Sequence, residues 1–442
     1  MESVLFEGIR PYSEGSVMNY FKQKTAVIID PYSSGSLFFD AFKAEGVNVV
    51  AVMSEKQPPD VYASSFRPDD FSDIYISDSD DLEGLAAKLK EYEPICVLAG
   101  CESGVELAES LAPLVCPDLS NDRSLAQARR DKGLMSAAVS CAGVPMMRQI
   151  CTNNLSEVNE WININNFDND YLVVKPPKSA STDGVKKVNR YGGELHDAFT
   201  DLINNPNRLG IINDRVLVQE YLTGVEYVVD TFSYEGRHSI CSICKYTKVD
   251  TDLGMAIYDR MDWISPKADV VEQLSDYAKA VLNALGMRFG NAHIEIMMTA
   301  NGPRLIELGA RPHGGGNPRL CRIATGDSQL HRSVRYFTSG VTPPDEYILK
   351  KNMTVVFLMA KQASIVTSLS LMHDLKKLNS FLEGKINIDE GQYIPATKDL
   401  FATLALGYFV LANNDLDTLE EDIQAIRSAE YEVYQPVLED IA

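Results

Sequence analysis

The chain has 442 residues, 45% hydrophobic and 23% charged, which is typical of a globular protein of about two to four domains. Its 41 basic and 62 acidic side chains give a formal net charge of −21, which excludes broad binding to nucleic acid or to an anionic membrane surface. The N-terminus lacks the features of a secretory signal, and no apolar run approaches the ~20 residues of a membrane-spanning helix. We therefore expect a cytoplasmic protein that binds neither nucleic acid nor membrane.

Alternating elements at the start of the chain predict a small parallel α/β domain over residues 1–118. Apolar strands are expected at 25–30, 47–53 and 95–99, with helices near 37–45, 81–91 and 103–112. The first strand-to-helix loop, Ser33 to Ser36, could lie beside a ligand at the strand ends. Neither G-x-G-x-x-G nor GxxxxGK[ST] occurs, so a Rossmann dinucleotide site and a P-loop are both unsupported.

The rest of the chain is expected to form two further units, 119–342 and 343–442. A charged helix is expected at 120–142, and Pro343-Pro344 marks the boundary. Beyond it, strands at 354–360 and 403–410 and an acidic helix at 418–427 predict an α+β cap.

The eight cysteines are scattered and lie mostly in apolar contexts, which indicates reduced, buried thiols. Cys241 and Cys244 form a CxxC, but no second pair or nearby histidine completes a zinc set. Their segment resembles a strand, which would point the two sulfurs to opposite faces. We expect no metal or redox role there.

A first candidate site follows the predicted strand Tyr171 to Lys175. The next residues include Ser179, Ser181 and Gly184, and small or hydroxyl residues let backbone N–H groups approach phosphate oxygens while a lysine adds a point charge. By itself the pattern also fits an ordinary loop with a solvated lysine.

A second candidate site is a strand that ends in Gln219-Glu220-Tyr221-Leu222, breaks at Thr223-Gly224 and resumes with Glu226. A strand edge with free backbone groups can bind the polar edge of a purine, and a nearby carboxylate can hold ribose hydroxyls. The alternative is an ordinary β-bulge.

The strongest signal is a hairpin with strands at 293–298 and 305–308. Glu295 and Glu307 lie in these strands among Ile, Met and Leu. Two buried carboxylates repel each other unless a cation lies between them, and such a pair is what magnesium binds. The alternative, a surface hairpin with two solvated glutamates, fits the apolar neighbours poorly.

The loop of this hairpin sets its register. A two-residue turn at Asn301-Gly302 would place Glu295 opposite Leu308. A three-residue loop, Ala300 to Gly302, with Gly302 in the left-handed region and a bulge after it, pairs Glu295 with Glu307. We predict this second arrangement, with Arg311 just past the strand end and near any bound anion.

Together and in this order, these signals resemble the ATP-grasp superfamily over roughly residues 120–340. Within it, the H-x-E strand, the run L-I-E-L-G-A-R-P-H-G-G-G and the C-terminal cap are most similar to bacterial L-amino acid ligases, the dipeptide synthetases. The resemblance implies an α/β and α+β multidomain protein. It would have an N-terminal parallel α/β domain, an ATP-grasp domain with a mobile lid at about 150–222, and a C-terminal α+β cap.

The resemblance also implies roles for individual residues. ATP would be bound by Lys132, Lys175, Ser179, Ser181, Gly184, Gln219, Glu220, Tyr221, Leu222 and Glu226. Glu295 and Glu307 would hold two Mg²⁺ ions, with Mn²⁺ able to substitute. The catalytic residues would be Arg311 and Lys175, and the amino-acid substrates would meet His293, Arg311, His313, Gly314, Gly315 and Asn317, partly through backbone N–H groups of the glycine-rich loop.

One position departs from the superfamily pattern. Many ATP-grasp enzymes have Asn two residues after the second metal acid, and here that residue is Gly309. A water or a phosphate oxygen would then have to replace this metal ligand.

The implied function is an ADP-forming carboxylate–amine ligase that joins two L-amino acids through an acyl phosphate. Its partners would be ATP and small amino acids, and a homodimer is expected. One alternative is an ATP-grasp carboxylase or a purine-pathway ligase. Another is a nucleotide-binding regulatory protein, which the joint presence of Lys175, Glu295, Glu307 and Arg311 disfavours. The sequence identifies neither the two amino acids nor the base that deprotonates the attacking amine.

Overall fold

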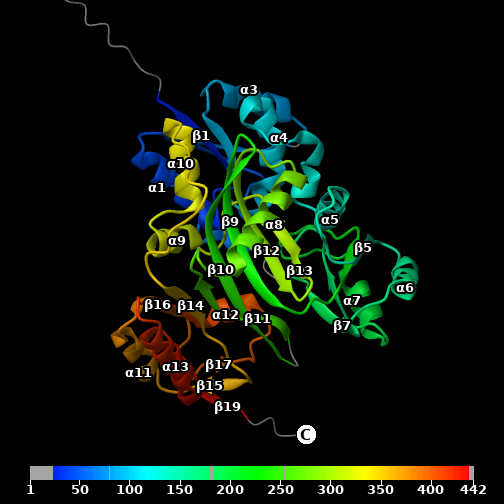
Figure 1. Cartoon of the computed structure of the whole chain (residues 1–442). Coiled ribbons are helices and arrows are strands. Elements are labelled where there is room, and N and C mark those ends of the chain that lie inside the picture. The colour runs from blue at the N-terminus through cyan, green and yellow to red at the C-terminus, as the bar shows by residue number, and fades with distance from the viewer. Residues whose placement is uncertain (1–22, 79, 180–182, 252–253, 438–442) are drawn as a thin grey trace, which may run out of the picture.

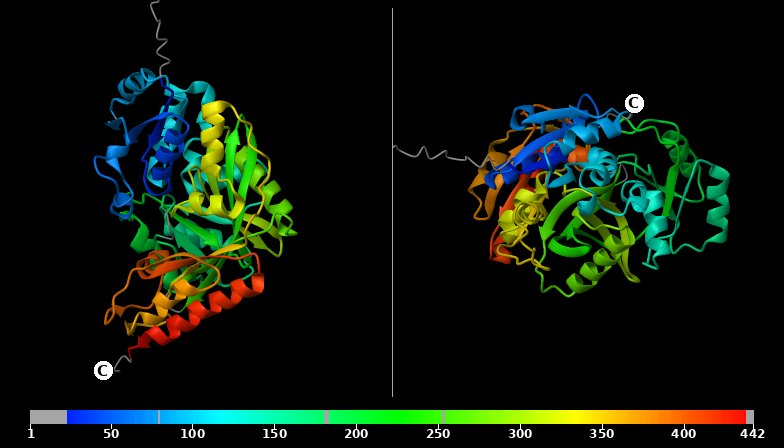
Figure 2. Two further views of the ribbon diagram at one scale, coloured as in Figure 1. Left: turned by 90° about the vertical axis from the view of Figure 1, so that its left-hand side faces the viewer. Right: turned by 90° about the horizontal axis from the view of Figure 1, so that it is seen from above.

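The computed structural model describes residues 23–78, 80–179, 183–251 and 254–437. The N-terminal domain lies at one end of the molecule and the C-terminal cap at the other, with a long central sheet between them (Figure 1). A smaller sheet with its own helices projects from one side, as the view from above shows (Figure 2). The predicted α/β and α+β class is confirmed, because a parallel sheet at the N-terminus is followed by antiparallel sheets with helices.

The N-terminal domain is a parallel sheet in the order β3-β2-β1-β4. The three predicted strands are confirmed, because their apolar runs are buried as parallel strands require. The fourth, β3, was missed because it is an edge strand with mostly exposed side chains. The main elements are β1 (Thr25–Ile29), α1 (Leu37–Ala44), β2 (Asn48–Met53), β3 (Asp73–Ile76), α3 (Leu82–Lys90), β4 (Cys96–Ala99) and α4 (Val105–Val115).

The central sheet has eight antiparallel strands in the order β13-β12-β9-β10-β11-β14-β18-β16. Three of these strands come from beyond residue 342, so the boundary at that residue, which stays a prediction, crosses a continuous sheet. The strands are β9 (Val225–Tyr234), β10 (Arg237–Thr251), β11 (Gly254–Trp263), β12 (Gly290–Thr299), β13 (Gly302–Gly309), β14 (Met353–Phe357), β16 (Phe381–Ile386) and β18 (Gly407–Ala412).

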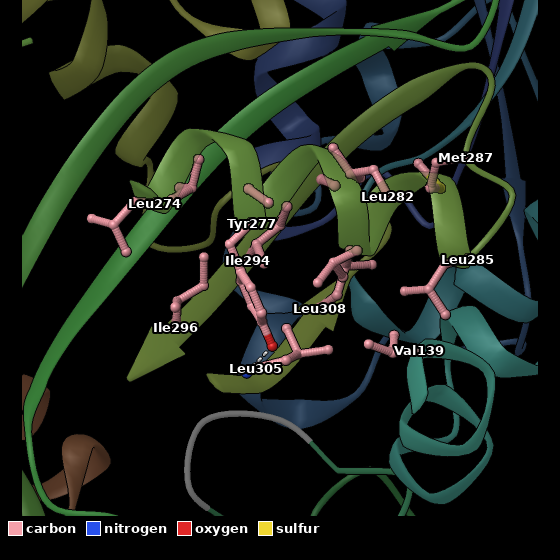
Figure 3. Packing of buried hydrophobic residues seen from close by; sticks show 14 of the residues in the cluster. Val139, Leu274, Tyr277, Leu282, Leu285, Met287, Ile294, Ile296, Leu305 and Leu308 are labelled. Carbon is pink, nitrogen blue, oxygen red and sulfur yellow. Dashed lines mark hydrogen bonds between the residues drawn. The ribbon is translucent and has the colours of Figure 1, made fainter. Parts of the chain in front are cut away.

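Helix α8 (Val270–Ala284) packs against the β12–β13 hairpin and fixes its orientation (Figure 3). Leu274 and Leu282 of the helix meet Ile294 and Leu308 of the strands in one buried cluster. The hydroxyl of Tyr277 also accepts a hydrogen bond of 2.8 Å from the backbone N–H of Leu305. Because alternate strand residues face opposite sides, this packing turns His293 and Glu295 away from the helix.

The side sheet, which we call the lid, has the order β5-β8-β6-β7. Its core includes Leu172, Val174, Phe199 and Val218. Its elements are β5 (Gln149–Thr152), α6 (Leu155–Ile164), β6 (Tyr171–Lys175), β7 (Lys186–Asn189), α7 (Glu194–Leu202) and β8 (Val216–Glu220).

The cap adds a small sheet, β17-β15-β19, and a long helix to the end of the central sheet. The predicted acidic helix is confirmed, and α13 is longer than expected. The remaining elements here are α9 (Asn317–Thr325), α10 (Gln329–Ser339), β15 (Ser364–Val366), α11 (Ser370–Asp374), β17 (Tyr393–Ile394), α12 (Leu400–Leu406), α13 (Leu416–Val433) and β19 (Tyr434–Pro436).

Two predicted elements were wrong. The helix expected at 120–142 begins only at α5 (Lys132–Cys141), because the carboxylate of Asp131 caps it by accepting hydrogen bonds from two backbone N–H groups. The strand expected at 403–410 starts as helix α12, which Asp399 caps by accepting a hydrogen bond from the backbone N–H of Ala402. It becomes strand only from Gly407, whose φ of +130° ends the helix.

The predicted strand at 241–244 lies within β10, but a β-bulge at Cys241 interrupts the alternation of faces, so Ile240 and Ile243 enter the same cluster. The predicted placement of the two sulfurs on opposite faces is therefore wrong, because Cys241 packs with Phe232 and Cys244 with Val228 on one face of the sheet. All eight cysteines are free thiols. Among the described residues, none of the helices has both the length and the apolar character needed to cross a membrane.

Candidate functional site

A cleft with about 830 Å³ of space lies between the lid and the central sheet. It gathers ten of the residues that the sequence assigned to ATP or metal: Lys132, Lys175, Ser179, Gln219, Glu220, Tyr221, Leu222, Glu226, Glu295 and Glu307. Gly184 is not part of its lining, but its neighbour Val185 is, and Ser181 lies outside the described residues. The three sequence signals, separated by up to about 130 residues, therefore share one cleft.

The two acids of the hairpin lie directly opposite each other, as the sequence predicted. The route to this register differs from the prediction. Thr299 pairs with Gly302 across a loop of two residues, and the bulge lies at Ile306 rather than just after the loop. The bulge lets Leu305 and Leu308, three residues apart, both enter the core, while Glu307 faces the cleft. Gly302 has the expected positive φ, +89°.

Two lysines accompany the acids. Nζ of Lys132 lies 3.2 Å from Oε2 of Glu307 and donates a hydrogen bond of 2.9 Å to the carbonyl oxygen of Ser179. Lys175 ends the lid strand β6 and is buried, and burial lowers its pKa to about 8. Both ammonium groups therefore lie where phosphate oxygens would approach the acid pair.

Lys248 and Tyr258 were missed by the sequence analysis. They are paired on β10 and β11, and Nζ of Lys248 lies 4.4 Å from the centroid of the Tyr258 ring. The same Nζ lies 2.6 Å from Oε1 of Glu226, the predicted ribose acid. Burial raises the pKa of Glu226, and the ion pair with Lys248 opposes that rise. The sequence could not predict this contact, because the neighbours of a lysine in a strand depend on which strands pair.

The side chain of Glu220 is held by Arg148. Its oxygens accept hydrogen bonds from the backbone N–H of Arg148 at 2.8 Å and from Nε at 2.7 Å. Gln219 Nε2 donates to Gln149 Oε1 at 2.5 Å. Both side chains are therefore engaged within the protein, and the backbone N–H of Glu220 donates to the carbonyl oxygen of Arg148 at 3.0 Å as well.

Asp230 connects His293 and His313, which the sequence assigned to the substrate. Its Oδ1 lies 3.3 Å from Nδ1 of His293, and its Oδ2 lies 3.1 Å from Nδ1 of His313. Nε2 of His293 lies 3.3 Å from Oε1 of Glu295, and Nε2 of His313 lies 2.9 Å from the Tyr246 hydroxyl. A buried series of polar groups thus leads from Tyr246 to Glu295, one of the two acids predicted to bind metal.

The hydrogen-bond acceptors in this series of side chains show which histidine nitrogens carry a proton. A carboxylate only accepts, so both Nδ1 atoms carry hydrogen, and Nε2 of His293 must carry one as well because it faces Glu295. Burial opposes the charged imidazole of His293, but hydrogen bonds to Asp230 and Glu295 raise its pKa above the ordinary value. Burial and the neighbouring His293 lower the pKa of His313 to about 4, so His313 is neutral and accepts from Tyr246. Ligand atoms of Asp230, His293 and His313 lie within 4.8 Å of one another, as in a metal site, but these hydrogen bonds already satisfy them.

Arg311 lies at the end of the hairpin and is held from two sides. Its Nε donates to Oε2 of Glu102 at 2.9 Å, and Nη1 donates to the carbonyl oxygen of Pro312 at 3.0 Å. Glu102 comes from the N-terminal domain and was missed by the sequence analysis, although it follows the carboxyl end of β4, where α/β sheets place ligand sites.

The glycine-rich loop contacts the serine loop of the N-terminal domain. The N–H of Gly316 donates to Oγ of Ser34 at 2.9 Å, and that of Gly315 donates more weakly to Oγ of Ser33 at 3.4 Å. His313 and Asn317 also donate their backbone N–H groups within the protein. The expectation that this run offers several N–H groups to a substrate is therefore wrong for these residues, since folding already uses them.

Comparisons with known proteins agree with this arrangement. A model described as ATP-grasp domain matches residues 169–318. The chain is 31% identical to dapdiamide A synthase from Enterobacter agglomerans, over 72% of this chain and 73% of that protein. The chain therefore belongs to the ATP-grasp ligase family.

Other similar proteins share less sequence identity with this chain. An L-arginine-specific L-amino acid ligase from Bacillus subtilis is 22% identical over 64% of this chain and 68% of that protein. The solved L-amino acid ligase from Bacillus licheniformis superposes with a TM-score of 0.68 and 14% identity, over 95% of this chain and 100% of that chain. An N5-carboxyaminoimidazole synthetase from Staphylococcus aureus, solved with ADP, gives 0.65 and 15%, over 92% and 99%. Both structural likenesses concern the fold alone.

Proposed function

We propose that this ATP-grasp protein is an ADP-forming carboxylate–amine ligase that joins two L-amino acids. The observation that carries the proposal is the cleft in which Glu295 and Glu307 face each other beside Lys132 and Lys175. An arginine, Arg311, stands two residues beyond the same hairpin. This set suits a reaction that transfers a phosphoryl group and then handles an anionic intermediate.

Glu295 and Glu307 fit a divalent cation, Mg²⁺ or in its place Mn²⁺. Oε1 of Glu295 is engaged by His293 and Oε2 of Glu307 by Lys132, so each carboxylate keeps its second oxygen for a cation. Such oxygens are what Mg²⁺ prefers, together with phosphate and water. Bound there, the metal would neutralise the phosphates of ATP during transfer.

The reaction has two steps. A carboxylate oxygen of the first amino acid attacks the γ-phosphorus of ATP, the bond to the β–γ bridging oxygen breaks, and ADP leaves. The amine of the second amino acid then attacks the acyl carbon, loses one proton, and the bond to phosphate breaks. Lys132 and Lys175 would hold the phosphates in the first step, and Arg311 would donate to the developing oxyanion in the second.

The relatives support amino acids as substrates. One curated relative is named as a dapdiamide synthase and another as an L-arginine-specific L-amino acid ligase. A carboxylase or a purine-pathway ligase is the second candidate, because solved proteins of those kinds share the fold. Their 11–15% identity gives that candidate no support beyond the fold.

The test is phosphate release from Mg-ATP with the twenty L-amino acids, singly and in pairs. We expect release that requires particular pairs, together with ADP and a new dipeptide by mass spectrometry. Release that needs bicarbonate instead would favour a carboxylase, and silence across all pairs would contradict the proposal.

A further inference from the structure

Glu102 is a buried carboxylate that contacts two arginines from another part of the chain. Its Oε2 accepts the hydrogen bond from Nε of Arg311, and its Oε1 lies 3.3 Å from Nη1 of Arg130. Only 7% of its side chain is exposed. Burial opposes its charge, but Arg130 and Arg311 lower the pKa of this carboxyl group, so Glu102 is ionised. The three groups together carry one net positive charge.

The Glu102–Arg311 pair occupies the space beside Gly309. A Cβ atom at this position would lie 3.1 Å from both Oε2 of Glu102 and Nε of Arg311, which is tighter than nine in ten real Cβ contacts. A side chain at 309 would require the ion pair to shift by a few tenths of an ångström, so the pair is best accommodated beside glycine. This accounts for the departure from the asparagine that many ATP-grasp enzymes carry here.

The pair leaves one edge of the Arg311 guanidinium available. Nε is bound to Glu102 and Nη1 to Pro312, while Nη2 has no hydrogen-bond partner in the described part of the chain. Two bonds fix the plane of the guanidinium, so the remaining N–H groups have a defined direction. A donor held in this way needs no reorganisation when negative charge develops.

Arg130 shows the same incompleteness. Its Nη1 and Nη2 atoms are buried and make no hydrogen bond to the described residues. Nη1 has the 3.3 Å ion-pair contact with Oε1 of Glu102, and only 2% of the Arg130 side chain is exposed. A buried donor without a partner is costly, and more so when charged. An anionic group of a ligand beside Glu102 would satisfy donors of both arginines.

We propose that Glu102 is a positioning residue that holds Arg311, with Arg130 behind it, toward the anionic acyl intermediate. The inference rests on the proposed ligase function. It concerns the N-terminal domain, which thereby contributes to the chemistry of a site otherwise built from the ATP-grasp domain.

The first test is the variant Glu102→Gln, which keeps the shape of the side chain and removes its charge. We expect kcat for dipeptide formation to fall about 10- to 100-fold, the scale of a misoriented catalytic group. The KM for ATP should change less than about threefold, because Glu102 is not part of the lining of the ATP cleft. A KM for ATP that rises as much as kcat falls would overturn the proposal.

A matched control is Glu109→Gln. Glu109 lies on the same side of the N-terminal domain and forms a buried ion pair with Arg129, the neighbour of Arg130, away from the ATP cleft. Both variants should lower the melting temperature, but only Glu102→Gln should lower kcat per folded molecule. Equal loss of kcat in the two would assign Glu102 a structural role alone.

The decisive test combines Glu102→Gln with Arg311→Ala. If Glu102 acts through Arg311, the double variant should be no slower than Arg311→Ala, within about twofold. Additive losses would overturn the proposal. Should Glu102→Gln fail to fold, Gly309→Ala displaces the same pair without changing any charge, and the same non-additivity with Arg311→Ala is expected. A wild-type protein that forms no dipeptide would contradict the ligase function itself, which is a different outcome from an active wild type with additive losses.

Discussion

Nζ of Lys132 lies 3.2 Å from Oε2 of Glu307 and also donates to the carbonyl oxygen of Ser179. One lysine therefore links the pair of acids to the loop that follows the lid strand β6. Lys132 is the first residue of α5, and Asp131 caps that helix. The cap therefore fixes the backbone position from which the Lys132 side chain extends. Lys132 thus connects the acids proposed to bind metal with the segment proposed to bind phosphate.

Glu307→Gln should abolish ATP turnover and leave the fold intact. The change removes one of the two negative charges that face each other across the hairpin, so Mg²⁺ loses a carboxylate ligand. The size of the side chain is kept, so the hairpin keeps its packing on α8. We expect at least about a 100-fold loss of phosphate release, since charge neutralisation on the γ-phosphoryl group depends on the metal. Phosphate release against Mg²⁺ concentration, with circular dichroism as the check on folding, measures this. If Glu307→Gln turned over ATP at the wild-type rate, the assignment of Glu307 as a metal ligand would be wrong.

We expect activity to fall at alkaline pH because Lys175 loses its positive charge. Burial lowers its pKa to about 8, so the free protein loses this positive charge as pH rises through that value. The kcat/KM for ATP, which reports the free enzyme, should therefore fall above pH 8. Lys175→Arg should lack this fall, because a guanidinium stays charged. A second check is proton uptake on ATP binding at pH 8.5, measured calorimetrically in buffers of different ionisation enthalpy.

Local sequence predicted those parts of the site that depend on one segment. The acid hairpin, the lysine at the end of β6 and the hinge after β8 all follow from patterns within about 12 residues. The pairing of Glu295 with Glu307 was predicted correctly, but the position of the bulge was not, because packing of Leu305 and Leu308 on α8 decides it.

Parts of the site that depend on distant segments could not be predicted in this way. Lys248 meets Glu226 only because β10 pairs with β9, and Asp230 meets His293 only because β9 pairs with β12. Glu102 reaches Arg311 across more than 200 residues of sequence, from a different domain. In each case the residue type is ordinary for its element, and only the tertiary arrangement gives it a chemical role.

We expect the protein to lose stability in mild acid because of His331, which is not part of the cleft lining. Burial and the neighbouring Arg322 lower its pKa to about 4, whereas an unfolded histidine has about 6.5. The unfolded chain therefore binds more protons between these values, and stability falls as pH decreases from 6.5 to 4. The melting temperature of His331→Gln should fall less steeply than that of wild type over this range, and parallel curves would contradict the assignment.

Asp230→Asn should impair catalysis through the histidines that it orients. An amide offers one acceptor and one donor, so it cannot accept from the Nδ1 atoms of both His293 and His313. His293 would then hold Glu295 less well, and we expect kcat to fall about 10- to 100-fold and the Mg²⁺ concentration for half-maximal rate to rise. Ser242→Ala is the matched control, because it removes a 3.2 Å hydrogen bond to Oδ2 of Asp230 and leaves both histidine contacts in place. A loss of melting temperature without any change in Mg²⁺ dependence would mean that Asp230 only stabilises the fold.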